Sequence, residues 1–191
     1  MYDETKLINS AKQGDRGAFD QLVLKYSNDI FRYAYRILRH EQDAQNASQD
    51  TFLKAWQGLK SFKGISKFST WLYSISYNVC MNYLKKRKKE ASVSTEDVPL
   101  PFDETTASKN SHNTTPEESY LQKERLKVLN EAIDKLPPHH KQMMILRFIE
   151  GFSYEEIAKI TALPLGTVKS KISRARDKLI ELLKKNMELF N

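Results

Sequence analysis

The stretch from Phe152 to Leu183, FSYEEIAKITALPLGTVKSKISRARDKLIELL, contains two short helical patterns separated by a break. Ser153 and Glu156 have the spacing of a capping box, in which each side chain bonds the main-chain N–H of the other residue, so a helix is predicted to begin here. Pro164 interrupts this first helix, and Gly166 is expected to allow a close approach in the turn. Apolar residues then recur at helical spacing, at Val168, Ile172, Ala175 and Leu179. The stretch therefore predicts a helix-turn-helix.

The second helix of this pair has a polar and cationic face opposite its apolar stripe. The face consists of Lys169, Ser170, Ser173 and Arg174, with Lys171, Arg176 and Lys178 on its flanks. Short polar and cationic side chains at this spacing can reach base edges in the major groove, while the flanking cations hold phosphates. We therefore expect this helix to bind duplex DNA. The alternative is a solvated basic face on an ordinary helical hairpin.

Length and charge suggest how the rest of the chain is organised. The 191 residues suffice for two small domains, and the net charge of +7 fits a polyanionic partner. Residues 89 to 118 sum to −5, whereas the remainder carries +12. This acidic segment is rich in Pro, Ser, Thr and Asn and has little apolar periodicity, which is typical of a linker. Helical patterns cover most of the remaining sequence, and strand-like alternation is absent. We predict an all-α protein with two small helical domains, residues 1–88 and 118–191, joined by a flexible acidic linker at 89–117.

A long helix of the first domain, predicted from about Ser66 to Lys86, has two distinct stripes. One is apolar and should be buried: Phe68, Leu72, Ile75 and Val79. The other combines an aromatic residue, amides and a cation: Trp71, Ser74, Asn78, Asn82 and Lys85. The loop before the helix adds Phe62, Lys63 and Lys67. Aromatic rings, amides and cations together are typical of a surface that binds single-stranded nucleic acid. The alternative is that Phe62 and Trp71 belong to the helical core.

Two segments resemble bacterial sigma factors of the extracytoplasmic-function type, in the sigma-70 family. They are DAQNASQDTFLKAWQGLKSFKGISKFSTWLYSISYNVCMNYLKK and LPPHHKQMMILRFIEGFSYEEIAKITALPLGTVKSKISRARDKL. The resemblance implies that the first domain melts and reads the minus-ten promoter element and that the second reads the minus-thirty-five element. It also implies that both act with core RNA polymerase and that an anti-sigma factor regulates them. The linker would then thread towards the polymerase active site, although a solvated tether remains the alternative.

The resemblance assigns roles to individual residues. Phe62 matches the loop aromatic beside the flipped minus-ten base, and Asn78 matches the helix amide near the melted strand. Lys63, Lys67, Trp71 and the cations from Lys85 to Lys88 would help to hold that strand. Lys169, Ser170, Ser173 and Arg174 match the base-facing positions of the recognition helix. The polymerase-docking positions are Asp43, Gln49, Asp50, Phe52 and Trp56. Because Gln45 and Asn46 stand where relatives often have acidic residues, the charge pairing with polymerase would rest more on Asp43 and Asp50.

We predict no catalytic site, metal or cofactor, and no small-molecule substrate. His139 and His140 lack a third ligand at metal spacing, and Cys80 lacks a cationic or histidine neighbour that would activate it. No signal peptide follows Met1 and no apolar run has membrane length, so we expect a cytoplasmic protein without membrane insertion. A stand-alone helix-turn-helix regulator, which would bind duplex DNA as a dimer, and a helical adaptor remain as alternatives.

Overall fold

The computed structural model describes residues 3–91 and 116–184, with side chains for 3–90 and 124–184, and all regular structure in these ranges is helical. The first half contains α1 (Glu4–Lys12), α2 (Arg16–Leu38), α3 (Glu41–Gly58), the 3-10 turn η1 (Leu59–Ser61) and α4 (Phe68–Ala91). The second half contains α5 (Pro116–Asp134), α6 (Pro138–Phe148), α7 (Tyr154–Thr161) and α8 (Leu165–Leu183). The all-α prediction is therefore confirmed. Most of the predicted linker, residues 92–115, lies outside the described residues, and α4 and α5 enter its predicted range at either end.

Helix boundaries in the first half follow from capping residues. Asp3 accepts a hydrogen bond from the N–H of Thr5 at the start of α1, and Asp15 accepts one from Ala18 at the start of α2. Such caps satisfy main-chain donors that have no partner within the helix. Gly14 joins the two helices with a φ of 100°, a conformation that a residue with a side chain rarely adopts. The turn between α1 and α2 is therefore short, and the two helices pack directly against each other.

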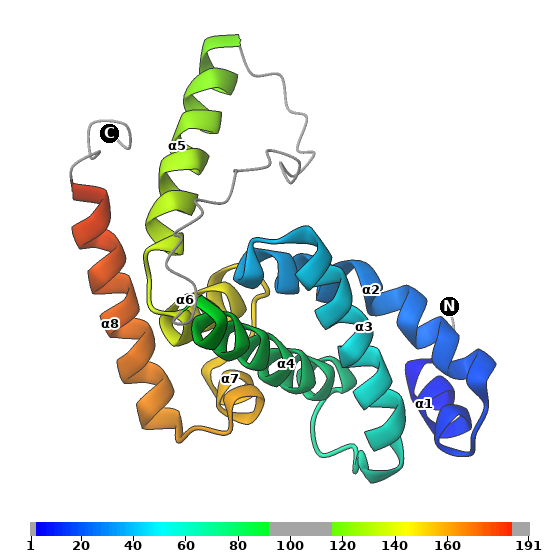
Figure 1. Ribbon diagram of the computed structural model, residues 1–191. Helices are drawn as coiled ribbons and strands as arrows, with labels where there is room; N and C mark the ends of the chain where they lie inside the picture. Colours follow the sequence, from blue (N-terminus) through cyan, green and yellow to red (C-terminus); the bar gives the residue numbers. More distant parts are fainter. Residues whose placement is uncertain (1–2, 92–115, 185–191) are drawn as a thin grey trace.

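Helix α4 lies at the centre of the molecule, between the other helices of the first half and those of the second (Figure 1). One of its faces packs on α2 and α3, whereas another contacts α6 and α7. The ring of Tyr73 on α4 meets that of Phe152, just before α7, at a centroid distance of 4.8 Å. Helix α5 projects away from this body, and its described part contacts α8 (Figure 1). Buried residues of both halves consequently form one continuous core.

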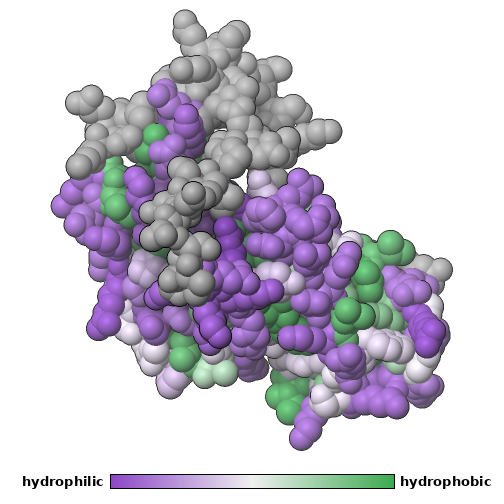
Figure 2. Space-filling model, viewed as in Figure 1, coloured by the Kyte–Doolittle hydropathy of each residue, from purple (hydrophilic) through white to green (hydrophobic). Residues whose placement is uncertain are grey.

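The face of the molecule shown in Figure 2 is mainly hydrophilic. Hydrophobic residues appear on it in small separate groups, several of them at the end formed by α1 to α3 (Figure 2). None of the helices, within the parts of the chain that the structure describes, is long and apolar enough to cross a membrane.

Candidate nucleic-acid and polymerase interfaces

The predicted helix-turn-helix is present as α7 and α8. Ser153 Oγ accepts the N–H of Glu156 at 3.1 Å, and Glu156 Oε2 accepts the N–H of Ser153 at 2.9 Å, which confirms the capping box. Pro164 immediately precedes α8, as its effect on a helix predicts. The expectation for Gly166 is wrong: it lies in α8, and a Cβ atom there would have no neighbour within 4 Å. The turn is made instead by Ala162, which takes a left-handed φ of 54°.

The exposed face of α8 carries several cations. Val168, Ile172, Ala175 and Leu179 are buried against the rest of the domain, so the opposite face is left to the solvent. On that face Lys169, Ser170, Ser173, Arg174 and Arg176 are exposed and Lys171 is half-buried. Among the side chains that the structure describes, those of residues 3–90 and 124–184, no carboxylate lies within ion-pair distance of the cations in this set. By contrast, Lys178 is paired with Glu181 at 3.1 Å. The α8 face therefore has charge available for a polyanion.

The polar stripe of α4 is present along one edge of the first domain. Asn78 is exposed, and its Nδ2 donates to the Ser74 carbonyl at 2.9 Å. Ser74 in turn donates to the carbonyl of Trp71 at 2.7 Å, and Lys85 is exposed further along the helix. These side chains share an edge because residues three and four apart project from one face of a helix. Asn78 and Lys85 are therefore both exposed along this edge.

The ring of Phe62 is buried, in contrast to that stripe. It is only 7% exposed and lies 5.8 Å from the ring of Phe68 and 5.1 Å from that of half-buried Trp71, measured between centroids. This packing corresponds to the core alternative raised from the sequence. The loop after it exposes Lys63 and Lys67, which the sequence predicts as DNA contacts. It also exposes Ile65, whose exposed fraction is 79% and which the sequence patterns do not single out.

The acidic residues of α3 are engaged within the chain. Asp50 is half-buried rather than exposed and accepts a hydrogen bond from the hydroxyl of Tyr83 at 3.0 Å. Oδ2 of Asp43 lies 3.9 Å from Nη1 of Arg87, and the Asp43 side chain is 26% exposed. The predicted docking residues Gln49, Phe52 and Trp56 are respectively exposed, half-buried and half-buried.

An apolar residue stands among these docking positions. Leu53 on α3 is 60% exposed, although the sequence does not indicate it as a docking residue. The sequence does contain an indication of this exposure, because Leu53 is apolar but lies outside the buried stripe of Ala47, Thr51 and Ala55.

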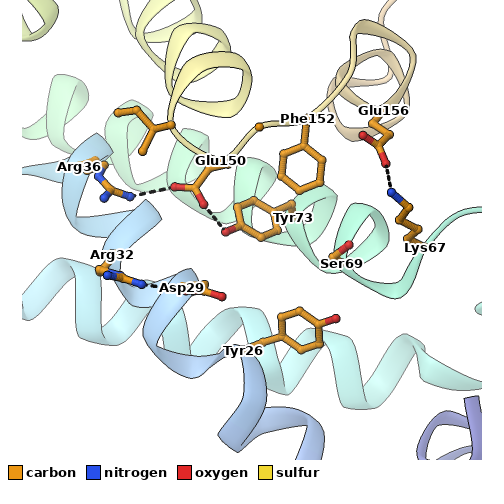
Figure 3. Close-up of a pocket in the computed structure, with 12 residues that line it drawn as sticks. Tyr26, Asp29, Arg32, Arg36, Lys67, Ser69, Tyr73, Glu150, Phe152 and Glu156 are labelled. Carbon is orange, nitrogen blue, oxygen red and sulfur yellow. Dashed lines mark hydrogen bonds and ion pairs between the residues drawn. The ribbon is translucent and has the colours of Figure 1, made fainter. Parts of the chain in front are cut away.

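Beside the apolar packing of Tyr73 on Phe152, polar side chains join the two halves, and we call these polar side chains the interdomain contact. Its centre is Glu150, which accepts from Arg36 at 2.8 Å and from the Tyr73 hydroxyl at 2.6 Å (Figure 3). The Glu150 side chain is only 12% exposed. Burial and the neighbouring carboxylate raise the pKa of Tyr73 well above its ordinary value, so its hydroxyl remains a donor.

A cleft of about 540 Å³ lies beside Glu150. Its lining cations Arg32, Arg36 and Lys67 are already paired with Asp29, Glu150 and Glu156 (Figure 3).

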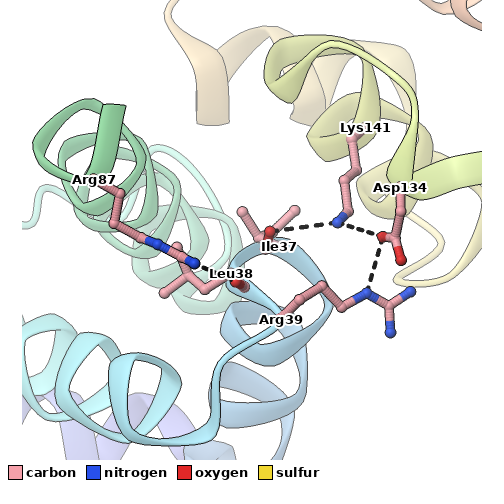
Figure 4. A network of polar contacts seen from close by, with 6 residues as sticks. All are labelled: Ile37, Leu38, Arg39, Arg87, Asp134 and Lys141. Carbon is pink, nitrogen blue, oxygen red and sulfur yellow. Dashed lines mark hydrogen bonds and ion pairs between the residues drawn. The ribbon is translucent and has the colours of Figure 1, made fainter. Parts of the chain in front are cut away.

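A second group of polar residues joins the end of α2 to the start of the second domain (Figure 4). Asp134 accepts from Arg39 at 2.9 Å and from Lys141 at 2.6 Å. Lys141 also reaches the Ile37 carbonyl at 3.4 Å. Burial lowers the pKa of Lys141, and the nearby Asp134 opposes this shift.

Cations of both domains surround the histidine pair at the start of α6. The hydroxyl of Tyr77 and Nδ1 of His139 are 3.1 Å apart. Burial lowers the pKa of His139, and so do the positive charges of Lys171 and Lys85. Lys85 belongs to α4 and Lys171 to α8, so positive charge from both predicted DNA surfaces acts on His139.

The single cysteine, Cys80, is buried. Burial raises the pKa of the Cys80 thiol to about 12, so the thiol stays protonated at neutral pH. No cluster of three His, Cys, Asp or Glu side chains suited to a metal ion occurs among the described residues.

Comparisons with known proteins identify the family. Residues 22–90 match the model of sigma-70 region 2, and residues 126–179 match that of sigma-70 region 4. The chain is 36% identical to the RNA polymerase sigma-H factor of Pseudomonas aeruginosa over 183 residues, or 94% of this chain and 93% of the relative. It is also 36% identical to the extracytoplasmic-function sigma-E factor of Haemophilus influenzae, with 90% of each chain covered.

A solved structure agrees with these matches. The sigma factor RpoE of Bartonella quintana, crystallised with the anti-sigma factor NepR, is 30% identical and superposes with a TM-score of 0.69. The comparison covers 87% of this chain and 96% of RpoE. The predicted all-α fold, helix-turn-helix and sigma-factor resemblance thus agree with both sequence and structure comparisons. The chain belongs to the sigma-70 family, as a sigma factor of the extracytoplasmic-function type.

Proposed function

We propose that this sigma factor, which directs core RNA polymerase to promoters, divides promoter reading between α8 and α4. Residues 118–191 would read the minus-thirty-five element as a duplex, and residues 1–88 would melt and read the minus-ten element. The observation that carries this division is the α8 face, where Lys169, Arg174 and Arg176 are exposed and form no ion pair with any described carboxylate. A DNA-reading helix needs such a face because its cations bind phosphates and base edges of the DNA in place of carboxylates of the protein.

In the first domain, the exposed edge of α4 is the proposed contact with the melted strand. Asn78 supplies an amide oxygen, and Lys63, Lys67 and Lys85 supply charge for the backbone. The half-buried Trp71 has part of its ring available for a base. Phe62, with its ring buried, would act mainly by supporting Trp71 and the loop from Lys63 to Lys67.

For polymerase docking we propose a surface on α3 centred on Leu53. Its exposed side chain lies three residues from both Asp50 and Trp56, which places these residues on one face of the helix. An exposed apolar residue surrounded by polar and aromatic neighbours is a common centre of a protein interface. Gln49, Phe52 and the carboxylates of Asp43 and Asp50 would form the rim of this contact.

Promoter reading by both domains requires the interdomain contact to open. The names of the minus-ten and minus-thirty-five elements place them about 25 base pairs apart, which corresponds to about 85 Å along the duplex. In the structure, however, Lys85 and Lys171 both lie near His139. Opening would separate the rings of Tyr73 and Phe152 as well as the polar interdomain contact, and it would let water reach the buried Gln142 amide nitrogen, which has no hydrogen-bond partner among the described residues. Core polymerase would then hold the separated domains at the required distance.

An anti-sigma factor is a further expected partner of this chain. The chain resembles a sigma factor that was crystallised with an anti-sigma factor, so we expect an anti-sigma factor to bind this chain as well. Such a protein acts in the cytoplasm, where polymerase and promoter DNA are found, and catalyses no reaction of its own.

The test is a promoter-binding assay with and without purified core polymerase. A target promoter is first mapped by transcript ends after overexpression of the chain. With core polymerase, the chain is expected to give a specific footprint over both elements. Without it, binding should be weak because the two reading surfaces are not held at the right separation. A stand-alone regulator would instead bind the duplex tightly by itself.

A further inference from the structure

Lys12, the last residue of α1, contacts the residue that begins the predicted minus-ten loop. Its ammonium group donates to the Phe62 carbonyl at 2.5 Å, across 50 positions of the chain. The same ammonium lies 5.3 Å from the centroid of the Phe62 ring. Lys12 therefore interacts with both the main chain and the side chain of Phe62, by a charge-assisted hydrogen bond and a cation–π contact.

The position of Lys12 is fixed by the packing of α1. Ile8 and Ala11 on this helix are buried, and α1 packs against α2 along its length. Lys12 is half-buried, whereas Lys6 on the same helix is exposed. The contact with Phe62 is consequently made from a helix that is packed on the core of the first domain.

Phe62 is one of two fixed ends of the loop from Lys63 to Lys67. Its N–H donates to the Leu59 carbonyl at the end of η1, and its ring packs against that of Phe68, which is 2% exposed and begins α4. Between these ends, Gly64 takes a φ of 70°, so the loop turns sharply. Lys12 and Phe68 thus hold Phe62 from two sides, and the direction in which the loop leaves the domain depends on both.

We propose that Lys12 is a positioning residue for minus-ten reading: it holds Phe62 from α1 and so fixes the loop that contacts the melted strand. This inference rests on the proposed function of that loop. Lys12 itself does not need to touch DNA, because its ammonium group already bonds the Phe62 carbonyl. Loss of the charge would leave the loop attached through the Phe62 and Phe68 rings but less well oriented.

A purely structural role would have a different signature. A residue that only ties α1 to η1 would, when replaced, lower stability and reduce promoter opening equally on every sequence. A residue that orients a base-reading loop would also reduce the preference for the native minus-ten bases. Base discrimination is therefore the decisive measurement.

The experiment uses the full chain with core polymerase on its mapped promoter and on single-base variants of the minus-ten element. The variants are Lys12→Met, which keeps the length of the side chain but removes its charge, and Lys12→Arg, which retains a cationic donor. Lys6→Met is the matched control on the same helix. Open-complex formation is followed by permanganate reactivity of unpaired thymines, alongside core-binding affinity and the thermal midpoint of the free protein.

We expect Lys12→Met to reduce open-complex formation on the native promoter by about tenfold, as the loss of one charge-assisted hydrogen bond would. The ratio between native and substituted promoters should shrink several-fold, while core binding stays within about twofold of wild type. Lys12→Arg should restore most of the discrimination, and Lys6→Met should behave as wild type.

Two results would overturn the inference and leave the proposed function standing. One is an unchanged base preference for Lys12→Met. The other is an equal loss on all promoters together with a lower thermal midpoint, which would make Lys12 a structural tether. If the wild-type chain with core polymerase opens no promoter, the proposed function fails, and the inference fails with it.

Discussion

The burial of Phe62 leads to a specific prediction about stability. Its ring is 7% exposed within a cluster with Phe68 and Trp71, so Phe62→Ala removes a large part of that cluster. We expect the free energy of unfolding to fall by about 3 to 5 kcal/mol. Denaturation with urea measures this loss. Ile65→Ala, in the same loop but 79% exposed, is the control and should cost less than about 0.5 kcal/mol.

A different outcome would favour direct stacking by Phe62. A Phe62→Ala protein that keeps its unfolding free energy but fails to melt promoter DNA would mean that the ring leaves the core to meet a base. The sequence does not distinguish these roles, because an aromatic residue that follows a helix can pack inward or face solvent with the same spacing. Only the positions of Phe68, Trp71 and Lys12 in space decide where the ring lies.

The helices α7 and α8 were predictable because their determinants are local. The Ser153–Glu156 pair and Pro164 act within one or two turns of the chain, and both appear as expected. Gly166 is expected to allow a close approach in the turn, yet it lies in α8 and Ala162 adopts the left-handed conformation instead. The hydrogen bond from Tyr83 to Asp50 joins different helices, so no local pattern could predict that Asp50 would be half-buried.

Substitutions on α8 separate base reading from phosphate binding. Arg174→Ala should relax sequence preference in the minus-thirty-five element at a cost of about 1 to 3 kcal/mol. Arg176→Ala should weaken binding evenly across sequences, since Arg176 is on the flank of the base-facing set. Competition binding with single-base variants of the element, in the polymerase complex, measures both effects. Equal behaviour of the two variants would make α8 a phosphate-binding surface without sequence readout.

On α3, the exposed Leu53 should matter for polymerase binding. Leu53→Arg would place a charge at the centre of the proposed docking surface, and we expect affinity for core polymerase to fall by about tenfold or more. Fluorescence titration of labelled chain with core enzyme measures the change. Leu24→Arg is a matched control because Leu24 is 78% exposed on α2, outside the proposed surface. Equal affinities for the two variants would remove Leu53 from the interface.

The interdomain contact connects residues that are far apart in sequence, and it could not be predicted from local patterns. Glu150 and Arg36 are 114 positions apart. We expect Glu150→Gln to favour separation of the domains, because the neutral amide no longer forms the ion pair with Arg36. Small-angle scattering of the free protein should give a larger radius of gyration. An unchanged radius, with an unchanged thermal midpoint, would show that Glu150 does not hold the two halves together.

The histidines at the same boundary predict a dependence on pH. Burial lowers the pKa of His139 and of His140, and the cations of α4 and α8 add to the effect. A histidine whose pKa is lower in the folded state binds fewer protons there, so its stabilising effect is lost as pH falls below its ordinary pKa of 6.5. The thermal midpoint should therefore fall between about pH 7.5 and about pH 5.5. The fall should be smaller in a protein with His139→Gln and His140→Gln, and an identical fall would contradict this origin.

In the proposed function, the two DNA-reading surfaces of the chain bind a promoter effectively only when the chain is bound to core polymerase. The most direct test is permanganate reactivity at a mapped promoter, measured with core polymerase alone, with the chain alone and with both together. Unpaired thymines in the minus-ten element should appear only when both proteins are present. Tight, sequence-specific binding of the duplex by the free chain, or a promoter that stays paired with both proteins present, would contradict the account.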